Sequence, residues 1–410
     1  MPETGFDDLK TDLPWTGNLS ALIHGTLALL LVALPFKNVF YHFALFVLLF
    51  CFCVTLSRPF RPVLREQLKS LAPLLLGFMA VTTIMMVSNA LNGRNGDAWS
   101  IAVNFSLRYG LLIFVLTYFH RLGLLSPRRM VIFIWLGLLV QAGLALLQYR
   151  NLPPDLHFGW RITGAVENPN PFGLYMAIGA GLALHGLMQA VERGHKWQAG
   201  WWFTLAALFL FCCLQAGSRG AWLSVLAFGV AYAVCETAAR KQWLKNFRQS
   251  WLPFLGLGGV IVALFWIEPH LRDRLNSLLA MQSSYRLETW EIIIGRFVER
   301  PFFGHGMNTQ SYFESVQGIY DAHNIVLDIL LTLGLFGLLA YGFLAFLVGM
   351  KLWRGQRSVM VAMAALLLVN GMFGYGMTTG IHYLTCWVLL IVFAYILPAP
   401  VTEEAVAQAG

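Results

Sequence analysis

The sequence predicts an all-α protein, a polytopic bundle of about 12 transmembrane helices with a loop region that contains amphipathic helices. Of its 410 residues, 58% are hydrophobic and only 12% are charged. A soluble domain carries about 25% charged residues. The apolar residues form long runs, and the basic residues gather in alternate loops. The chain is therefore expected to use lipid as part of its solvent.

Each apolar run is long enough to cross ~30 Å of hydrocarbon, which takes about 20 residues in a helix. Such runs lie near residues 19–36, 38–56, 70–90, 99–119, 130–149, 171–191, 200–216, 221–238, 251–268, 323–350, 358–377 and 380–397. No repeat or low-complexity linker separates them. We therefore expect residues 1–410 to form a single integral membrane domain.

Lysine and arginine are concentrated in every second loop, between residues 58–69, 121–129, 193–196, 240–248 and 351–357. The positive-inside rule places these loops in the cytoplasm. With an even number of spans, both termini are then cytoplasmic as well. The net charge of +8 is explained by topology, so no nucleic-acid partner is expected.

The opposite side holds one large loop, residues 269–322, between the ninth and tenth predicted spans. Within it, SYRLETWEIIIGRFVER is predicted to be an amphipathic helix that lies in the membrane interface or caps the bundle. Its apolar stripe has helical spacing and consists of Leu287, Trp290, Ile293, Ile294 and Phe297. Glutamates at 288, 291 and 299 lie away from that stripe.

The basic residues of this second side are all arginines, which bind phosphate oxygens bidentately. We expect Arg161, Arg219 and Arg286 to line a pyrophosphate-binding cavity. Arg219 is the clearest of them, because it stands in the tight turn AGSRGAW at the start of a span, where an isolated charge has little structural use. The remaining arginines, Arg272, Arg274, Arg296 and Arg300, are expected to form surface ion pairs with the glutamates of the loop.

His323 stands where the large loop becomes a span, beside Asp321 and Asn324. A histidine there suits a general base acting on a hydroxyl, although an interfacial anchor is the alternative. Further down the same span, Gly334 and Gly337 are expected to be small packing residues.

Two Asn-Pro steps in RITGAVENPNPFGLY predict a turn before a helix. Asn168 and Asn170 could either cap that helix or bind a sugar.

No metal site and no cofactor is expected. The six cysteines show neither CxxC spacing nor a cluster with histidine. The sequence also lacks a DxD motif, a Walker loop and a GxSxG motif. Clustered arginines can instead neutralise a leaving diphosphate.

The segments RITGAVENPNPFG, SRGAWL, SSYRLETWEIIIGRFVERPFFGHGMNT and HNIVLDILLTLGLFG occur in this order. The ordered set, over residues 150–345, resembles the O-antigen ligase and polymerase superfamily, and bacterial O-antigen ligases most.

The resemblance implies a metal-independent, inverting glycosyltransferase of lipopolysaccharide biosynthesis in the bacterial inner membrane, with its active site facing the periplasm. The donor would be an O-antigen glycan on undecaprenyl pyrophosphate, and the acceptor would be lipid A–core. His323 resembles the essential histidine, Arg219 the arginine that opens its span, and Arg161 and Arg286 the pyrophosphate ligands.

Two other readings stay open. A polymerase would use the same donor with a lipid-linked glycan as acceptor. A transporter or flippase would explain the charges Arg108 and Asp328 within spans, although transporters often show repeated halves and the chain shows none.

Overall fold

The computed structural model describes residues 16–33, 38–56, 61–94, 96–151, 161–166, 168–239, 252–279, 286–307, 322–355, 357–374 and 381–397. Every regular element in these ranges is helical. The helices are α2 (Thr16–Ala33), α3 (Asn38–Val54), α4 (Arg61–Leu91), α5 (Gly96–Phe105), the π-helical turn η2 (Ser106–Gly110), α6 (Leu111–Arg121), α7 (Pro127–Arg150) and α8 (Pro169–Glu192). They continue with α9 (Lys196–Gln215), α10 (Arg219–Ala239), α12 (Leu252–Ile267), α13 (Pro269–Leu279), α14 (Arg286–Glu299), α15 (Ile325–Arg354), α16 (Ser358–Gly374) and α17 (Ile381–Ile396).

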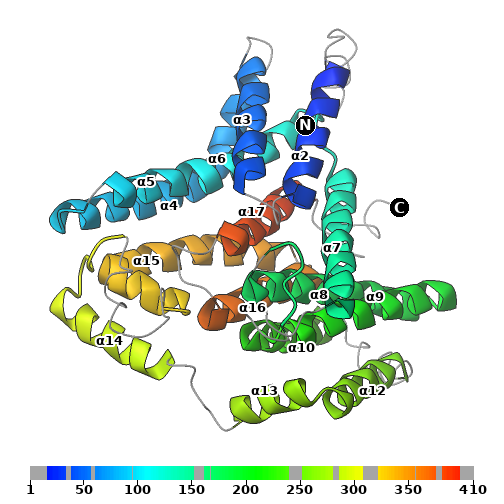
Figure 1. Cartoon of the computed structure of the whole chain (residues 1–410). Helices are drawn as coiled ribbons and strands as arrows, with labels where there is room; N and C mark the ends of the chain where they lie inside the picture. Colours follow the sequence, from blue (N-terminus) through cyan, green and yellow to red (C-terminus); the bar gives the residue numbers. More distant parts are fainter. Residues whose placement is uncertain are drawn as a thin grey trace.

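The prediction of an all-helical membrane protein is confirmed for the described residues. Seven helical stretches are long and apolar enough to cross a membrane, namely α4, the continuous α5–η2–α6 helix, α7, α8, α9, α10 and α15. Five shorter apolar helices, α2, α3, α12, α16 and α17, occupy the other predicted positions. In Figure 1, α2, α3 and α7 run up the view, whereas α4, α8, α9 and α15 run across it. Because only seven of the described helical stretches have span length, the predicted count of about 12 spans is not confirmed.

Helix α8 is the packing centre of the molecule, with neighbours on several sides, and its closest partners are α9 and α10 (Figure 1). Three of its glycines make room for aromatic rings. A Cβ at Gly179 would lie 2.7 Å from Phe209, and one at Gly181 would lie 3.0 Å from Phe228. A Cβ at Gly186 would meet the Trp202 ring at 2.5 Å. Small residues thus let α8 sit close to both neighbours, as is common in membrane bundles.

The predicted interface helix is present as α14, and its apolar residues divide between two faces. Ile293 is fully buried in a small cluster with Ala322 and Leu331, so this face packs on α15. Leu287 and Ile294, which were predicted to lie in the same apolar stripe as Ile293, are both more than half exposed. They lie on an outer apolar face, which suits contact with lipid.

Helix α15 is broken at Gly334, whose φ of 65° and ψ of −159° are not helical. Gly334, which was predicted to be a small packing residue, thus also carries a break in the helix that was not predicted. The break leaves backbone groups without helical partners, and the segment before α15 supplies them. His305 N donates to Leu331 O (2.8 Å) and Gly306 N to Thr332 O (2.9 Å). In the other direction, Leu335 N donates to Pro301 O at 2.8 Å.

This pairing brings two backbones into direct contact, which only glycine permits. A Cβ on Gly334 would lie 2.5 Å from the Phe302 carbonyl carbon, and a Cβ on Gly304 would lie 2.5 Å from the Thr332 carbonyl carbon. Ser88 of α4 adds a side-chain donor to Thr332 O at 2.8 Å. The non-helical backbone is thus covered by protein, the condition under which a membrane helix tolerates a break.

Gly334→Ala should destabilise the protein by at least ~1–3 kcal/mol, the typical cost of a residue held in a backbone region reserved for glycine. The clash with Phe302 adds to this cost. Gly342→Ala, in the same helix, is the matched control, because a Cβ there meets nothing within 4 Å. Thermal unfolding of the detergent-solubilised variants measures the difference. Equal melting temperatures for the two variants would contradict the role given to Gly334.

Candidate functional site

The turn between α9 and α10 is the point around which the predicted arginines gather. Gly217 adopts a φ of 60°, which lets the chain reverse tightly after Gln215. Gly217 N donates to Leu214 O at 2.9 Å and ends α9, and Arg219 then begins α10. The carbonyl oxygens of Ala216 and Gly217 are thereby left to accept hydrogen bonds from other segments.

Arg161 reaches this turn from the segment 161–166. Its Nε donates to Ala216 O at 2.8 Å, and its Nη2 donates to Asn170 Oδ1 at 3.2 Å. The main chain next to Arg161 also contacts the end of α9, because Ile162 N donates to Gln215 O at 3.2 Å. The structure therefore brings the predicted residues Arg161 and Asn170 together at the turn that carries Arg219.

Two glutamines of α7 hold the segment 161–166 in place. Gln148 Oε1 accepts from Thr163 N (2.9 Å) and from Gly164 N (3.0 Å). About two helical turns earlier in α7, Gln141 Oε1 accepts from Ala165 N at 3.0 Å. Loop amides that enter the bundle thus find side-chain acceptors, as buried backbone groups must.

Asn168 has the capping role that the sequence left open. It is the N-cap of α8, and its Oδ1 accepts from Asn170 N at 2.9 Å. Pro169 follows at the first helical position, where its missing N–H costs nothing. Asn168 thereby fixes the start of α8 and, through it, the side chain that Arg161 contacts.

Helix α13 closes the third side of the turn. Arg219 Nη2 donates to Ser277 Oγ at 2.6 Å, and Arg274 Nε donates to Gly217 O at 3.3 Å. His270 Nε2 lies 3.1 Å from Gln215 Oε1. Residues 270, 274 and 277 are spaced by four and three positions, so one face of α13 contacts the turn.

Arg274 bonds the backbone of the turn through its Nε, a contact that the predicted ion pair with a glutamate of the loop does not include. The same prediction is right for Arg296, which pairs with Glu299 at 3.1 Å. Arg300 instead donates to Asn92 Oδ1. The regular spacing in HLRDRLNS was the signal that could have identified α13 as part of the site.

His270 lies between the turn and a carboxylate. Glu268 Oε2 is 3.5 Å from His270 Nδ1, and Glu268 also accepts a hydrogen bond from Tyr149 at the end of α7. Burial lowers the pKa of His270, and the charges of Glu268 and Asp273 act in the opposite direction. The bond to Gln215 requires a proton on His270 Nε2, because an amide oxygen only accepts.

His323 is held in an unusual backbone conformation. Among the described residues it is the only non-glycine residue with positive φ, at 45°. On one side, the Asn324 side chain caps α15 by accepting from Val326 N (3.0 Å) and Leu327 N (3.1 Å). On the other side, Trp290 Nε1 donates to Ala322 O at 3.2 Å. A left-handed backbone conformation costs free energy at a residue other than glycine. Residues strained in this way are concentrated at functional sites.

The start of α15 and the start of α10 lie at the same end of the bundle, joined through α16. Asn370 Nδ2 of α16 donates to Ser224 Oγ of α10 at 3.0 Å. The next residue, Gly371, faces Ile325, which would lie 3.3 Å from a Cβ at that glycine. The α8 start joins the group, since a Cβ at Gly173 would lie 3.0 Å from Ala221. Three helix N-termini with their positive dipole ends therefore gather on the side that carries Arg161 and Arg219.

Arg286 begins α14, one turn before Trp290, whose indole anchors the residue next to His323. The side chain of Arg286 lies outside the described residues, as does Asp321. The expected part of Arg286 in a pyrophosphate site thus stays a prediction. Chemically, the described arrangement can bind a phosphate-bearing anion through guanidinium groups and can offer an imidazole at the same end of the bundle.

Comparison with known proteins relates this site to a family. Residues 204–342 match the family model described as O-antigen ligase. The matched region runs from α9 into α15 and contains Arg219, Arg286 and His323, whereas Arg161, Asn168 and Asn170 precede it. A comparison with curated proteins finds no match. Over residues 204–342, about a third of the sequence, the chain is therefore similar to this family.

Proposed function

We propose that this protein is an O-antigen ligase. It transfers an O-antigen glycan from undecaprenyl pyrophosphate to the lipid A–core acceptor, without a metal ion and with inversion at the anomeric carbon. The observation that carries the proposal is the convergence of Arg161, Arg219 and Arg274 on the α9–α10 turn. That turn lies within the region that matches the family.

The arginines serve the leaving group. A diphosphate gains negative charge as the bond from the anomeric carbon to its oxygen breaks. Guanidinium groups bind such oxygens in charge-assisted, bidentate pairs, and the gathered helix N-termini add positive potential. Asn170 accepts a hydrogen bond from Arg161, and Ser277 accepts one from Arg219, so both guanidinium groups are oriented before a donor binds. Arg286 joins them from the start of α14.

His323 serves the acceptor. The acceptor hydroxyl attacks the anomeric carbon from the face opposite the pyrophosphate, and its proton passes to the His323 imidazole. The new glycosidic bond forms as the bond to the diphosphate oxygen breaks, and undecaprenyl pyrophosphate departs with the electron pair. The cap at Asn324 and the Trp290 contact hold the backbone on both sides of the imidazole, which limits its motion. Holding a general base in a fixed orientation supplies a large part of its contribution to the reaction rate.

The proposed setting is the bacterial inner membrane, with both termini in the cytoplasm and the arginine side of the bundle facing the periplasm. The alternation of basic loops supports this orientation. The exposed outer face of α14, with Leu287 and Ile294, would then lie on the periplasmic leaflet, where both lipid substrates have their headgroups.

His323→Ala should lower glycan transfer by about 10²–10⁴-fold, the usual contribution of a general base, while donor affinity changes little. Purified protein in vesicles receives undecaprenyl-pyrophosphate glycan and lipid A–core, with a chelator present. Products are separated on gels, and donor binding is measured independently. The matched control is His195→Ala, because His195 is an exposed histidine whose side chain makes no cap bond at α9.

The products of this reconstitution also separate the alternatives. Lengthening of the lipid-linked glycan by the wild type, with none moved to lipid A–core, would show a polymerase. Movement of intact donor across the bilayer without transfer would show a transporter. Full activity of His323→Ala would remove the histidine from the chemistry.

Arg219→Ala should weaken donor binding and also slow transfer, because the guanidinium meets the diphosphate both before and during bond breaking. A hydrogen bond to a charged group is worth ~1.5–3 kcal/mol, which corresponds to about 10- to 150-fold in each affected constant. Arg219→Lys should recover only part of the loss, since ammonium lacks the planar fork. Arg296→Ala is the control, because its partner Glu299 lies on the exposed side of α14. An Arg219→Ala enzyme that differs from wild type no more than this control would contradict the assignment.

A further inference from the structure

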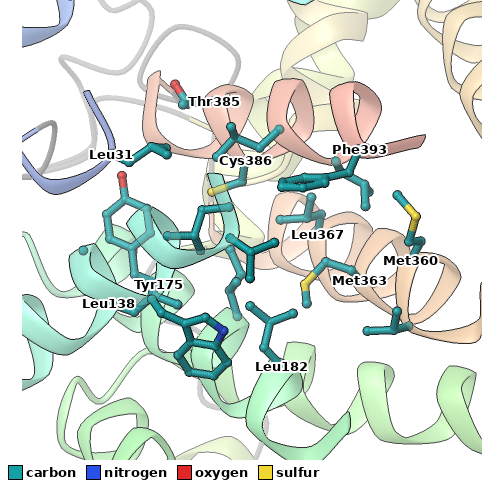
Figure 2. A pocket seen from close by; sticks show the side chains of 18 of the residues that line it. Leu31, Leu138, Tyr175, Leu182, Met360, Met363, Leu367, Thr385, Cys386 and Phe393 are labelled. Atoms are coloured by element: carbon teal, nitrogen blue, oxygen red, sulfur yellow. The ribbon is translucent and has the colours of Figure 1, made fainter. Parts of the chain in front are cut away.

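A largely apolar pocket lies beside the candidate site, between α7, α8, α16 and α17, with Leu31 of α2 at its edge. Its cavity volume is about 280 Å³. Figure 2 shows the side chains that surround it, including Leu138, Leu182, Met363, Leu367 and Phe393. Neither the arginines nor His323 lines it, so its lining has no part in the chemistry proposed above.

The pocket is elongated along the helices. On α8 it extends from Tyr175 to His185, and on α17 from Thr385 to Leu397. At 1.5 Å per residue these stretches are roughly 15–18 Å long, about half of the hydrocarbon thickness of a bilayer. A lining of this length and composition suits one extended hydrocarbon chain.

The polar side chains in this mostly apolar lining are Gln141, Tyr175, His185 and Thr385. Gln141 is 1% exposed, and its Oε1 accepts from Ala165 N at 3.0 Å. Its Nε2 is buried and finds no hydrogen-bond acceptor in the described part of the chain. A buried donor in this state is destabilising, so a ligand that brings an acceptor atom to it binds more tightly.

The same glutamine connects the pocket to the candidate site. The segment that Gln141 holds at Ala165 begins with Arg161, the guanidinium at the α9–α10 turn. Tyr175, at the same end of the pocket, stands little more than one helical turn after Asn170, the partner of Arg161. A molecule with its tail in the pocket therefore has its polar end beside the arginines.

We propose that this pocket binds the hydrocarbon tail of the pyrophosphate-linked donor, next to its headgroup, and that Gln141 Nε2 donates to an oxygen where tail and headgroup meet. The inference rests on the proposed function, which supplies a lipid pyrophosphate as donor. A single chain fits the elongated cavity, and the neighbouring guanidinium groups match a diphosphate better than a zwitterionic headgroup. The pocket thereby places the donor before the acceptor arrives.

Photo-cross-linking tests this assignment directly. The probe is a polyprenyl pyrophosphate with a diazirine in the tail near the headgroup, added to the full-length protein in vesicles without acceptor. Cross-linked peptides should come from α8 around residues 175–185, from α16 around 359–367 and from α17 around 385–397, and unlabelled polyprenyl pyrophosphate should compete. A phospholipid with a diazirine in one tail is the parallel arm. Equal labelling of the pocket by that phospholipid would overturn the proposal, because the pocket would then hold ordinary bilayer lipid.

Two variants of the pocket are tested, so that the experiment still gives a result if one of them fails to fold. Leu182→Trp fills the pocket and should abolish cross-linking there, whereas Leu226→Trp, at a residue 65% exposed on α10, should leave it unchanged. Gln141→Leu removes the buried donor and should weaken probe binding about tenfold, as expected for one hydrogen bond. Undiminished labelling in both pocket variants would refute the proposal.

Glycan transfer, assayed separately, distinguishes failure of this inference from failure of the function. If the wild type transfers glycan but the probe labels other helices, only the pocket assignment is wrong. If the wild type transfers nothing to any acceptor, the proposed function itself is wrong, whatever the probe labels.

Discussion

Backbone pairing between residues 301–306 and the interrupted helix α15 is the constraint that fixes the end of the molecule where the candidate site lies. Each amide and carbonyl freed at Gly334 would be costly inside a membrane, so the helix can break only where another backbone replaces the missing bonds. The segment 301–306 does so, with glycines at 304 and 334 allowing the contact. Because α14 leads directly into this segment, the pairing also sets where α14 can lie.

The position of His323 follows from that placement. Helix α14 packs on the first part of α15 through Ile293, and its Trp290 holds the carbonyl group of Ala322. The left-handed backbone of His323 is thus fixed between an indole and a helix cap. On the other side of α16, the α9–α10 turn collects guanidinium groups from three segments of the chain. The two halves of the site are joined through α16, by the Asn370–Ser224 hydrogen bond and by the packing of Gly371 against Ile325.

Much of the helical framework could be predicted from the sequence, because apolar runs of span length have few alternatives in lipid. Arg161 and Arg219 were expected in one cavity, and the structure places both at the α9–α10 turn. Asn168 has one of its two expected roles, the helix cap. The break at Gly334 could not be predicted, since its cause is a backbone segment some 30 residues earlier in the chain. The contact of Arg274 with the turn could not be predicted for a similar reason. Its acceptor is a main-chain carbonyl, and a carbonyl leaves no mark in the sequence.

The interruption of α15 also bears on how this part of the chain enters a membrane. The part of α15 after Gly334, from 335 to 354, has about 20 residues and can cross the hydrocarbon alone. The part before the break is consequently not needed for insertion. It is synthesised after residues 301–306, so its pairing partner already exists when it emerges. Insertion depends on the apolar residues after Gly334, whereas His323 and Asn324 lie before the break. Substitutions in one of these two parts can therefore accumulate during evolution without affecting the other.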